Sequence, residues 1–360
     1  MPSGYLALCS KNLATPTIKV PEEHFQTVRW AGDSNTDRDI AVGFQPDLTW
    51  VKNRTSGSKE WNIHDAVRGA GQWWTTHTSG INEADYSDYF GPFQANGFRV
   101  GDVSADTLYN ATSNNYCSWN WKGGNAISGT GDFTQGTIAS TCSRNVAAGF
   151  SIVKYTGTGS NGTVGHGLDG PPEFISIKRR NVLENFYAYH HKQSATPEDV
   201  YCYMSGTGGV TDDATIWQDT APTSSVFSIG TYSGVNTSSS ETIAYCWKSI
   251  EGYSKFGSYE ANASTNGPFI YTGFTPNMIM LIYIDGTGES WWIQDWERNS
   301  YNASNWPLFW NLKAAESAAG VIDFLSNGFK IRATNGGINT AGTTIYMAFA
   351  DFPFKYANAR

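Results

Sequence analysis

Hydrophobic and polar residues alternate along three stretches of the chain that share one pattern. Each stretch has an alternating run, a turn rich in Gly, Asn, Ser and Thr, a Gly–apolar step, a proline and a second alternating run. The three stretches are Phe25–Lys52, Phe150–Lys178 and Tyr253–Ile284. Alternation with a period of two is typical of half-buried β-strands. Its recurrence predicts one structural unit that occurs three times.

Further landmarks recur downstream in the same order within each unit. The first is an aromatic strand that ends in a polar residue, the second an apolar step around a phenylalanine, and the third a closing aromatic strand. In chain order they are Trp61–Asp65, Phe186–His190 and Trp291–Asp295; Asn96–Val100, Val226–Ile229 and Asn327–Ile331; Tyr116–Lys122, Ile243–Lys248 and Ile345–Ala350.

Many short strands between turns that contain Gly and Pro predict an all-β fold. We therefore expect three sequence-related β-sandwich-like repeats joined by Gly/Ser/Thr-rich loops. Asn311–Ala319 is the one good helix candidate, because it is rich in alanine and ends at Gly320. The expected divisions are a connector at 1–24, repeats at 25–122, 150–249 and 254–351, a linker at 123–149 and a tail at 352–360.

Composition narrows the classes of partner. Among the 360 residues only 16% are charged, against roughly 25% in average soluble domains, whereas 14% are aromatic. The net charge of −8 argues against nucleic acid as a partner, because binding to phosphates needs clustered Lys and Arg. The longest apolar run, Met278–Ile284, is far shorter than the ~20 residues that cross a bilayer, so we expect no membrane insertion.

The five cysteines are widely spaced and include no Cys-x-x-Cys pair, so neither zinc nor redox chemistry is indicated. We interpret Cys9, Cys117, Cys142, Cys202 and Cys246 as free thiols, consistent with assembly in a reducing cytoplasm. We expect no cofactor.

One turn carries oxygen ligands at the spacing of a calcium loop: Asp33, Asn35, Asp37 and Asp39. However, Arg38 stands where an EF-hand has its glycine, and Phe44 where it has its bidentate glutamate. We favour a solvated acidic turn, with calcium as the weaker alternative. His166, His190 and His191 lack the spacing of a metal pair, so we expect no metal there.

No residue pattern marks a catalytic centre. Asp65 and Asp295 recur with Arg68 and Arg298 three residues later, which favours a structural ion pair over an active site. The sequence has neither a Gly-x-Ser-x-Gly elbow nor a phosphate-binding Gly-rich loop. We therefore expect no enzyme, although glycoside hydrolysis stays open because the sequence does not show which carboxylates face each other.

The segment after Asp295 carries aromatic residues that have no counterpart in the first unit. Rings surplus to the fold are candidates for a ligand surface, and amide side chains beside them can bind hydroxyl groups. The candidate ligand residues are Trp296, Tyr301, Trp306, Asn302 and Asn305. The alternative is that these rings are buried anchors of the loop.

Several motifs resemble a known family: Gly4–Leu13, Gly43–Arg54, Asp65–Gly69, Gly149–Val153 and the end Ala348–Phe354. The chain is similar to repeat-containing virion proteins of tailed bacteriophages, particularly marine ones, that look like tail-fibre or other surface-fibre regions. This resemblance implies a non-enzymatic virion structural protein, made in the host bacterial cytoplasm, with other virion proteins and a host cell-surface glycan as partners. It also implies a homotrimer. The alternatives are a virion-associated polysaccharide depolymerase and a purely architectural head or tail component.

Overall fold

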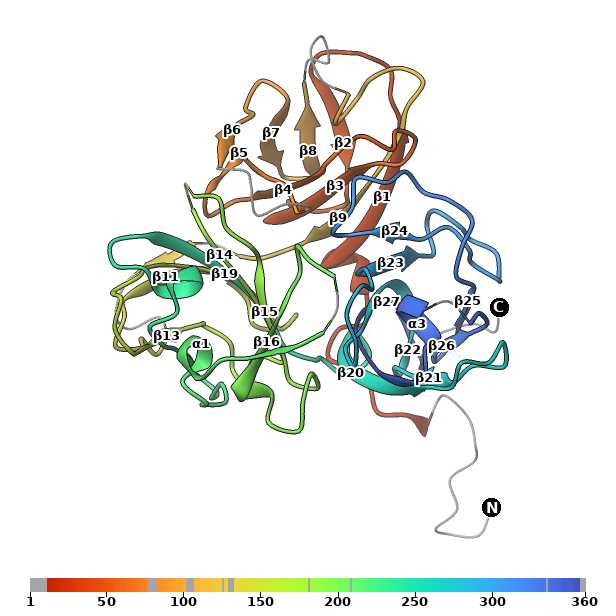
Figure 1. The fold of residues 1–360 in the computed structure, drawn as a ribbon. Coiled ribbons are helices and arrows are strands. Elements are labelled where there is room, and N and C mark those ends of the chain that lie inside the picture. Colours follow the sequence, from red (N-terminus) through yellow and green to blue (C-terminus); the bar gives the residue numbers. More distant parts are fainter. Residues whose placement is uncertain are drawn as a thin grey trace.

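In the computed structural model, antiparallel β-sheets form three lobes around a common centre (Figure 1). Strands account for 43% of the residues and helices for 6%, which confirms the predicted all-β class. The structure describes residues 12–76, 83–101, 107–124, 126–128, 133–180, 182–207, 209–334 and 336–356. Residues 1–11 of the expected connector, with Cys9, and 357–360 of the expected tail lie outside this part.

The first lobe has a larger sheet of order β1-β9-β3-β4-β5-β6 and a smaller sheet of order β2-β8-β7. Strands β3 and β4 are buried along their whole length because both of their faces are covered by other parts of the molecule. The elements are a 3-10 turn η2 (Pro21–Glu23), β1 (Phe25–Ala31), β2 (Arg38–Ala41), β3 (Leu48–Asn53), β4 (Trp61–Asp65), β5 (Gly69–Trp74), β6 (Ala84–Asp85), β7 (Phe90–Gln94), β8 (Gly97–Val100) and β9 (Asn115–Trp121).

The second lobe has a larger sheet of order β10-β11-β12-β19-β14-β15-β16-β17 and the pair β13-β18. The elements are β10 (Ala126–Ser128), β11 (Ser140–Asn145), β12 (Phe150–Thr156), β13 (Gly162–Gly165), β14 (Phe174–Arg179), β15 (Tyr187–His190), η3 (Pro197–Asp199), β16 (Val200–Tyr203), β17 (Thr211–Asp212), α1 (Ala214–Trp217), β18 (Val226–Ile229), α2 (Ser233–Asn236) and β19 (Glu241–Trp247).

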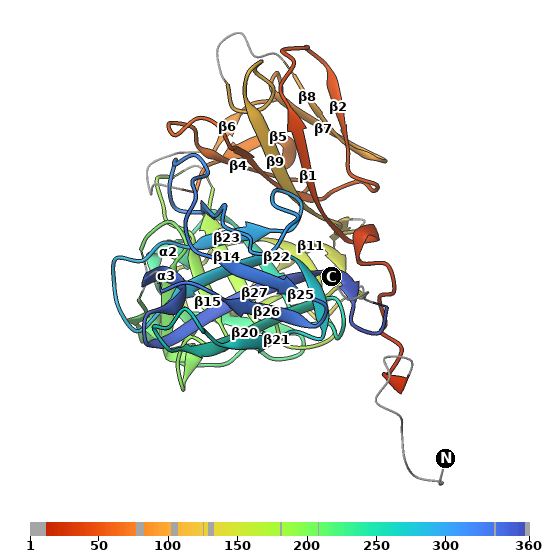
Figure 2. The same ribbon diagram turned by 90° about the vertical axis from the view of Figure 1, so that its right-hand side faces the viewer.

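The third lobe has a larger sheet of order β20-β27-β22-β23-β24 and a smaller sheet of order β21-β26-β25 (Figure 2). The elements are β20 (Ser254–Ala261), β21 (Phe269–Tyr271), β22 (Phe274–Tyr283), β23 (Trp292–Asp295), β24 (Leu308–Phe309), β25 (Ile322–Leu325), β26 (Gly328–Ile331), α3 (Gly336–Asn339) and β27 (Gly342–Pro353).

The same strand order lies at the heart of each larger sheet. In each lobe the closing strand is inserted between the first strand and the strand that follows the proline, giving β1-β9-β3-β4, β12-β19-β14-β15 and β20-β27-β22-β23. The pairing registers correspond as well, because Leu48 pairs with Trp121, Phe174 with Trp247 and Met278 with Phe349. Residues of different lobes can therefore be compared position by position.

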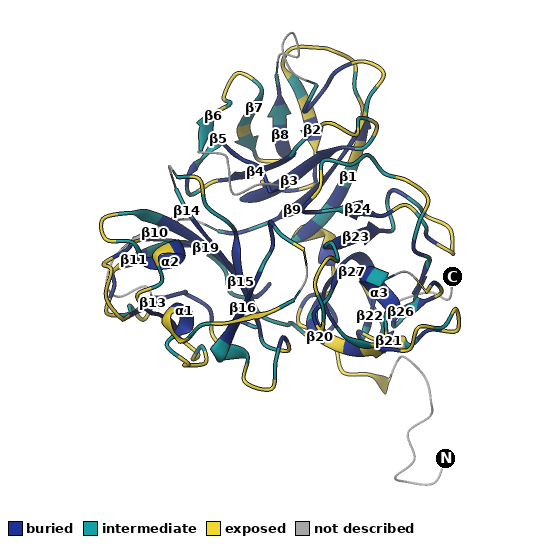
Figure 3. Ribbon diagram, in the orientation of Figure 1, coloured by how far each residue is buried: buried dark blue, intermediate teal, exposed yellow. Residues whose placement is uncertain are grey.

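The three lobes share one buried aromatic core. Trp121, Trp247 and Phe349 occupy corresponding places in the closing strands and meet at the centre. The ring of Trp121 lies 6.0 Å from that of Trp247 and 5.4 Å from that of Phe349, measured between ring centroids. Figure 3 shows the strands around this centre as buried, whereas the exposed residues lie mostly in outer loops. Each lobe has a further cluster between its two sheets.

Two expectations about local structure are wrong. The segment 123–149, expected to be a linker, contains β10 and β11, and β11 pairs with β12 along its whole length. Asn311–Ala319 is not helical. A helix of this length is marginal by itself, and here the segment is held extended against the first lobe. Lys52 Nζ donates to the carbonyl of Lys313 at 2.8 Å, and Arg54 forms a bidentate ion pair with Glu316.

A buried asparagine recurs in the three lobes just before the closing strand. Asn110, Asn236 and Asn339 are fully buried. The amide of Asn236 donates to the carbonyls of Ser160 and Gly230, at 2.8 and 2.6 Å, and its Oδ1 accepts from the Thr158 amide. Asn110 and Asn339 make the same kind of contacts in their own lobes. Each therefore ties the turn after the first strand to the end of the lobe.

Among the residues that the structure describes, the α-helices are four residues long, and none could cross a membrane.

Candidate functional site

The predicted ligand segment forms the loop between β23 and β24. Tyr301 is 82% exposed and Trp306 41% exposed, so both rings present a face to solvent. Trp296 instead packs partly buried against the core of the third lobe, with its ring centroid 6.1 Å from that of Phe324. Of the three predicted rings, two are therefore available to a ligand and one anchors the loop.

Hydrogen bonds hold this loop in place. Asn302 donates to the carbonyl of Phe324 at 2.7 Å and accepts from its amide at 2.9 Å. Asn305 Oδ1 accepts from Asn299 at 3.2 Å, and Arg298 donates to the carbonyl of Trp306 at 2.8 Å. The predicted ligand residues Asn302 and Asn305 are thus engaged in fixing the loop, which positions the two exposed rings.

The weak calcium candidate does not form a common site. Asp33 pairs with Arg38 at 3.2 Å, whereas Asp39 pairs with Arg99 at 2.7 Å. The Asp33 carboxylate also accepts the Asn35 amide, which lowers the pKa of Asp33. Within the described ranges, no group of three or more His, Cys, Asp or Glu side chains is placed to hold a metal ion.

The two predicted Asp–Arg ion pairs are present. Arg68 Nε donates to Asp65 and Arg298 Nε to Asp295, each at 2.5 Å between fully buried side chains. In both loops the same carboxylate also accepts a hydrogen bond from the backbone amide of the arginine, at 2.8 Å. The hydroxyl of Tyr245 in the second lobe also donates to Asp65 at 2.7 Å. Each pair therefore closes a tight turn at a junction between lobes.

A second acid extends each pair to a neighbouring lobe. Glu83 accepts from Arg68 of its own lobe and from Arg180 of the second lobe. Glu316 likewise accepts from Arg298 of its own lobe and from Arg54 of the first lobe. Because these acids lie between two arginines each, they link neighbouring lobes by charge as well as by packing.

His166 and His190 are buried and hydrogen-bonded, whereas His191 is partly exposed and contacts the carbonyl of Phe256. His190 takes the place that Asp65 and Asp295 hold in the other lobes, and its Nε2 donates to the carbonyl of Tyr346 at 3.1 Å. Burial lowers the pKa of His190 to about 3 and that of His166 to about 4. Both imidazoles are therefore neutral at pH 7.

Cys117, Cys142, Cys202 and Cys246 are buried and form no disulfide, which confirms the thiol prediction for these residues. Burial raises the pKa of Cys117 and of Cys202 to about 12. Because the thiolate is the nucleophile, these cysteines are unreactive and act as small hydrophobic side chains.

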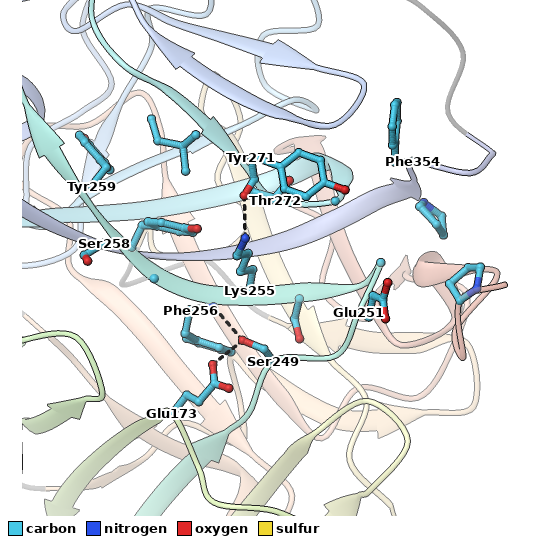
Figure 4. A pocket seen from close by; sticks show the side chains of 18 of the residues that line it. Glu173, Ser249, Glu251, Lys255, Phe256, Ser258, Tyr259, Tyr271, Thr272 and Phe354 are labelled. Carbon is cyan, nitrogen blue, oxygen red and sulfur yellow. Dashed lines mark hydrogen bonds between the residues drawn. The ribbon is translucent and has the colours of Figure 1, made fainter. Parts of the chain in front are cut away.

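Sequence reasoning missed a groove of about 770 Å³ where the second and third lobes meet. One wall is β20 and the other is β21 with the turn that follows it, and Leu13, Ala14 and Pro16 also line the groove. Figure 4 shows Lys255 pointing from β20 toward Tyr271, and Ser249 lying between Glu173 and Phe256. Phe269 and Tyr271 are 46% and 51% exposed.

The polar groups of the groove are held by one another. Ser249 donates its hydroxyl to Glu173, and His191 Nε2 lies 3.0 Å from the carbonyl of Phe256 and 3.6 Å from Glu173. Serine is thus bonded to the carboxylate and not to the imidazole. This order differs from the serine–imidazole–carboxylate relay of acyl transfer, where the imidazole must take the hydroxyl proton. The arrangement instead offers fixed hydrogen-bonding groups beside exposed rings.

A sequence signal for this junction does exist. Glu173 follows Pro172, as Asp47 follows Pro46 and Asn277 follows Pro276. All three polar residues lie at junctions between lobes: Asp47 lines a smaller hollow between lobes one and two, and Asn277 accepts from Thr27 of the first lobe at 2.7 Å. Burial raises the pKa of Asp47 to about 6. Comparing the residues that follow these prolines would have identified positions at the junctions between lobes. It would not have shown which junction contains an open groove.

Comparison with known families gives one match. A family described as a domain of unknown function (DUF7483) matches residues 20–353, a range that runs from η2 to the end of β27 and includes all three lobes. No curated protein and no solved structure matches the chain. The chain therefore belongs to the DUF7483 family.

Proposed function

We propose that this chain is a non-enzymatic structural protein of a tailed-bacteriophage particle, of tail-fibre or surface-decoration type, that recognises carbohydrate on the host surface. The virion placement is supported by the motifs that run from Gly43–Arg54 to Ala348–Phe354. Recognition is supported by a rigid loop that presents rings to solvent. The groove chemistry, with its serine bonded to a carboxylate, favours binding over acyl transfer.

The observation that carries the proposal is the pair of exposed rings, Tyr301 and Trp306, in a loop fixed by Asn302 and Arg298. A sugar offers C–H faces and hydroxyl groups, and therefore stacks on aromatic rings without needing net charge. Because the loop is already fixed, it loses less conformational entropy when a ligand binds. Each ring is expected to contribute on the order of 1 kcal/mol.

The test is binding to host cells or to their purified surface polysaccharide. Trp306→Ala and Tyr301→Ala should each weaken binding about fivefold to tenfold with little change in melting temperature, since both side chains reach solvent. Tyr356→Ala, which removes a ring 44% exposed near the C-terminus, is the matched control and should bind as the unchanged protein does. Unchanged binding by both loop variants would refute a glycan site in this loop.

The polysaccharide depolymerase is the alternative function. It predicts new reducing ends when the protein is incubated with the host polysaccharide, whereas a binder releases none. A cryo-EM map of the virion would test the placement on the particle and separate a receptor-binding part from a purely architectural one.

The proposed assembly is a homotrimer, in keeping with fibre-type virion proteins and with a surface low in charge. Light scattering of the full chain at micromolar concentration should give three times the 39.4 kDa chain mass. A monomeric mass would argue against the trimer without affecting the proposed glycan loop.

A further inference from the structure

The second and third lobes differ at one corresponding edge of the sandwich, which is covered in the second lobe and open in the third. In the second lobe a segment of the chain covers this edge: β11 pairs with β12, and Ile138 forms a parallel bridge with Val164 of β13. In the third lobe the corresponding strands are β20 and β21. Strand β20 is the edge of its sheet, and the groove of about 770 Å³ lies where the covering segment would be.

The residues at this edge are small in the second lobe, where the covering segment lies against them, and aromatic in the third. Val164 pairs with Phe227 as Ile270 pairs with Phe329, so Thr163 corresponds to Phe269 and Gly165 to Tyr271. A Cβ atom on Gly165 would lie 2.4 Å from the carbonyl oxygen of Thr134 in the covering segment. A tyrosine at this position leaves no room for a strand on the same path.

At Phe256 and Tyr271, side chains already occupy backbone groups that an added strand would need. The Phe256 amide donates to Ser249 Oγ at 3.1 Å, and the Phe256 carbonyl accepts from His191. On the other wall, Lys255 Nζ donates to the carbonyl of Tyr271 at 2.7 Å. The groove is thus closed to a long added strand but open to a ligand with flat apolar faces and many hydroxyl groups.

We propose that this groove is a saccharide-binding site distinct from the Tyr301–Trp306 loop, and that it takes a segment of a linear polysaccharide. Sugar faces stack on Tyr271 and Phe269, while hydroxyl groups bond to Ser258 and Glu251 along the other side. The volume falls within the roughly 300–1,000 Å³ of ligand pockets. The inference shares its ligand class with the proposed function but rests on a different surface.

The experiment is affinity electrophoresis of the full chain in native gels that contain laminarin, dextran, galactomannan or hydroxyethylcellulose. At least one polysaccharide should retard the protein. The double variant Phe269→Ala/Tyr271→Ala should lower the association constant for that polysaccharide by about tenfold or more. The matched variant Leu183→Ala/Leu312→Ala, which removes two exposed apolar side chains outside both proposed sites, should keep the retardation.

A second variant tests the groove without removing its rings. Ser258 is exposed in the groove, so Ser258→Trp fills the space and should abolish retardation while the melting temperature stays unchanged. A labelled peptide copying residues 133–145 tests for strand docking and should not bind. The inference is overturned if no gel retards the protein, if the groove variants migrate as the unchanged protein does, or if the peptide binds. Binding of the Tyr301→Ala and Trp306→Ala variants to host polysaccharide tests the proposed loop separately, so either site can fail while the other still binds.

Discussion

At the scale of single residues, Asn236 shows how one polar side chain can connect several loops by hydrogen bonds. It is fully buried, and its amide group bonds the carbonyls of Ser160 and Gly230 and the backbone amide of Thr158, of which the bond to Gly230 is buried. Leaving buried polar groups unpaired costs more than a hydrogen bond contributes. The recurrence of the residue as Asn110 and Asn339 marks it as a requirement of the unit, not of a ligand.

The first prediction follows from these contacts. Asn236→Ala should lower the free energy of unfolding by about 2–3 kcal/mol, because it removes three hydrogen bonds at once, among them the donor to the buried carbonyl of Gly230. Urea denaturation measures the change. Thr237→Ala removes a single exposed hydrogen bond next door and should cost less than about 0.5 kcal/mol. Equal effects of the two substitutions would contradict this role of Asn236.

The second prediction concerns His190 and pH. Because burial holds its folded pKa at about 3, below the value of about 6.5 expected in the unfolded chain, the unfolded state binds the proton first. This contribution to stability is fully present above pH 6.5 and is lost as the pH falls toward 3. Each pH unit in that window should cost on the order of 1 kcal/mol.

The measurement is the free energy of unfolding from pH 7 to pH 4, compared with that of His190→Gln. The variant should show a shallower fall, since its side chain does not titrate. Asp47 acts in the opposite direction between about pH 6 and 4, because its raised pKa makes the folded state bind the proton first. Identical slopes in the two proteins would rule out His190 as a source of the pH dependence.

At the scale of elements, the covering segment of the second lobe determines which sandwich edges are closed. Strand β11 belongs to the sheet of β12, whereas Ile138 bridges to β13, so the segment joins both sheets across the edge. Gly136 makes this path possible, because a Cβ atom there would lie 2.0 Å from the carbonyl oxygen of Thr163. The third lobe has aromatic side chains at the same edge and keeps its groove.

The third prediction is that Gly136→Ala loosens the covering segment. The clash with Thr163 should destabilise the protein by about 1–3 kcal/mol and speed amide exchange in β11. Exchange in β20 of the third lobe should not change. Gly57→Ala is the matched control, because a Cβ atom there meets its nearest neighbour at 3.7 Å, an ordinary contact. Unaltered exchange in β11 would show that the segment tolerates the extra atom.

At the scale of the whole molecule, the lobes form one packed body. Trp121, Trp247 and Phe349 belong to different lobes and to one buried cluster, and Glu83 and Glu316 bridge arginines of neighbouring lobes. Removing one lobe would expose the central faces of the other two. The lobes are therefore expected to unfold together.

The fourth prediction is a single calorimetric transition for the full chain, with the calorimetric enthalpy equal to the van't Hoff enthalpy. Trp121→Ala should lower its midpoint without splitting it, because this ring contacts residues of both other lobes. A large-to-small change of this kind in a core costs about 3–5 kcal/mol. Separate transitions for the lobes would show that the shared core does not couple them.

What the sequence by itself determined is local. Period-two alternation marks the strands because a strand with one buried face needs it, and recurrence of landmarks marks corresponding positions. The turn around Asp65 and Arg68 could be predicted because its partners are three residues apart. The exposed rings Tyr301 and Trp306 could be proposed because the corresponding segment of the first unit has no aromatic residues.

Only the tertiary structure decided how the units close on one another. Glu316 pairs with Arg54, which lies 262 residues earlier in the chain. That contact keeps Asn311–Ala319 extended, although its alanine content favours a helix. The covered edge of the second lobe and the open groove of the third likewise depend on which segments meet in space. Local patterning cannot encode these outcomes, because each depends on contacts between residues that the folded centre brings together.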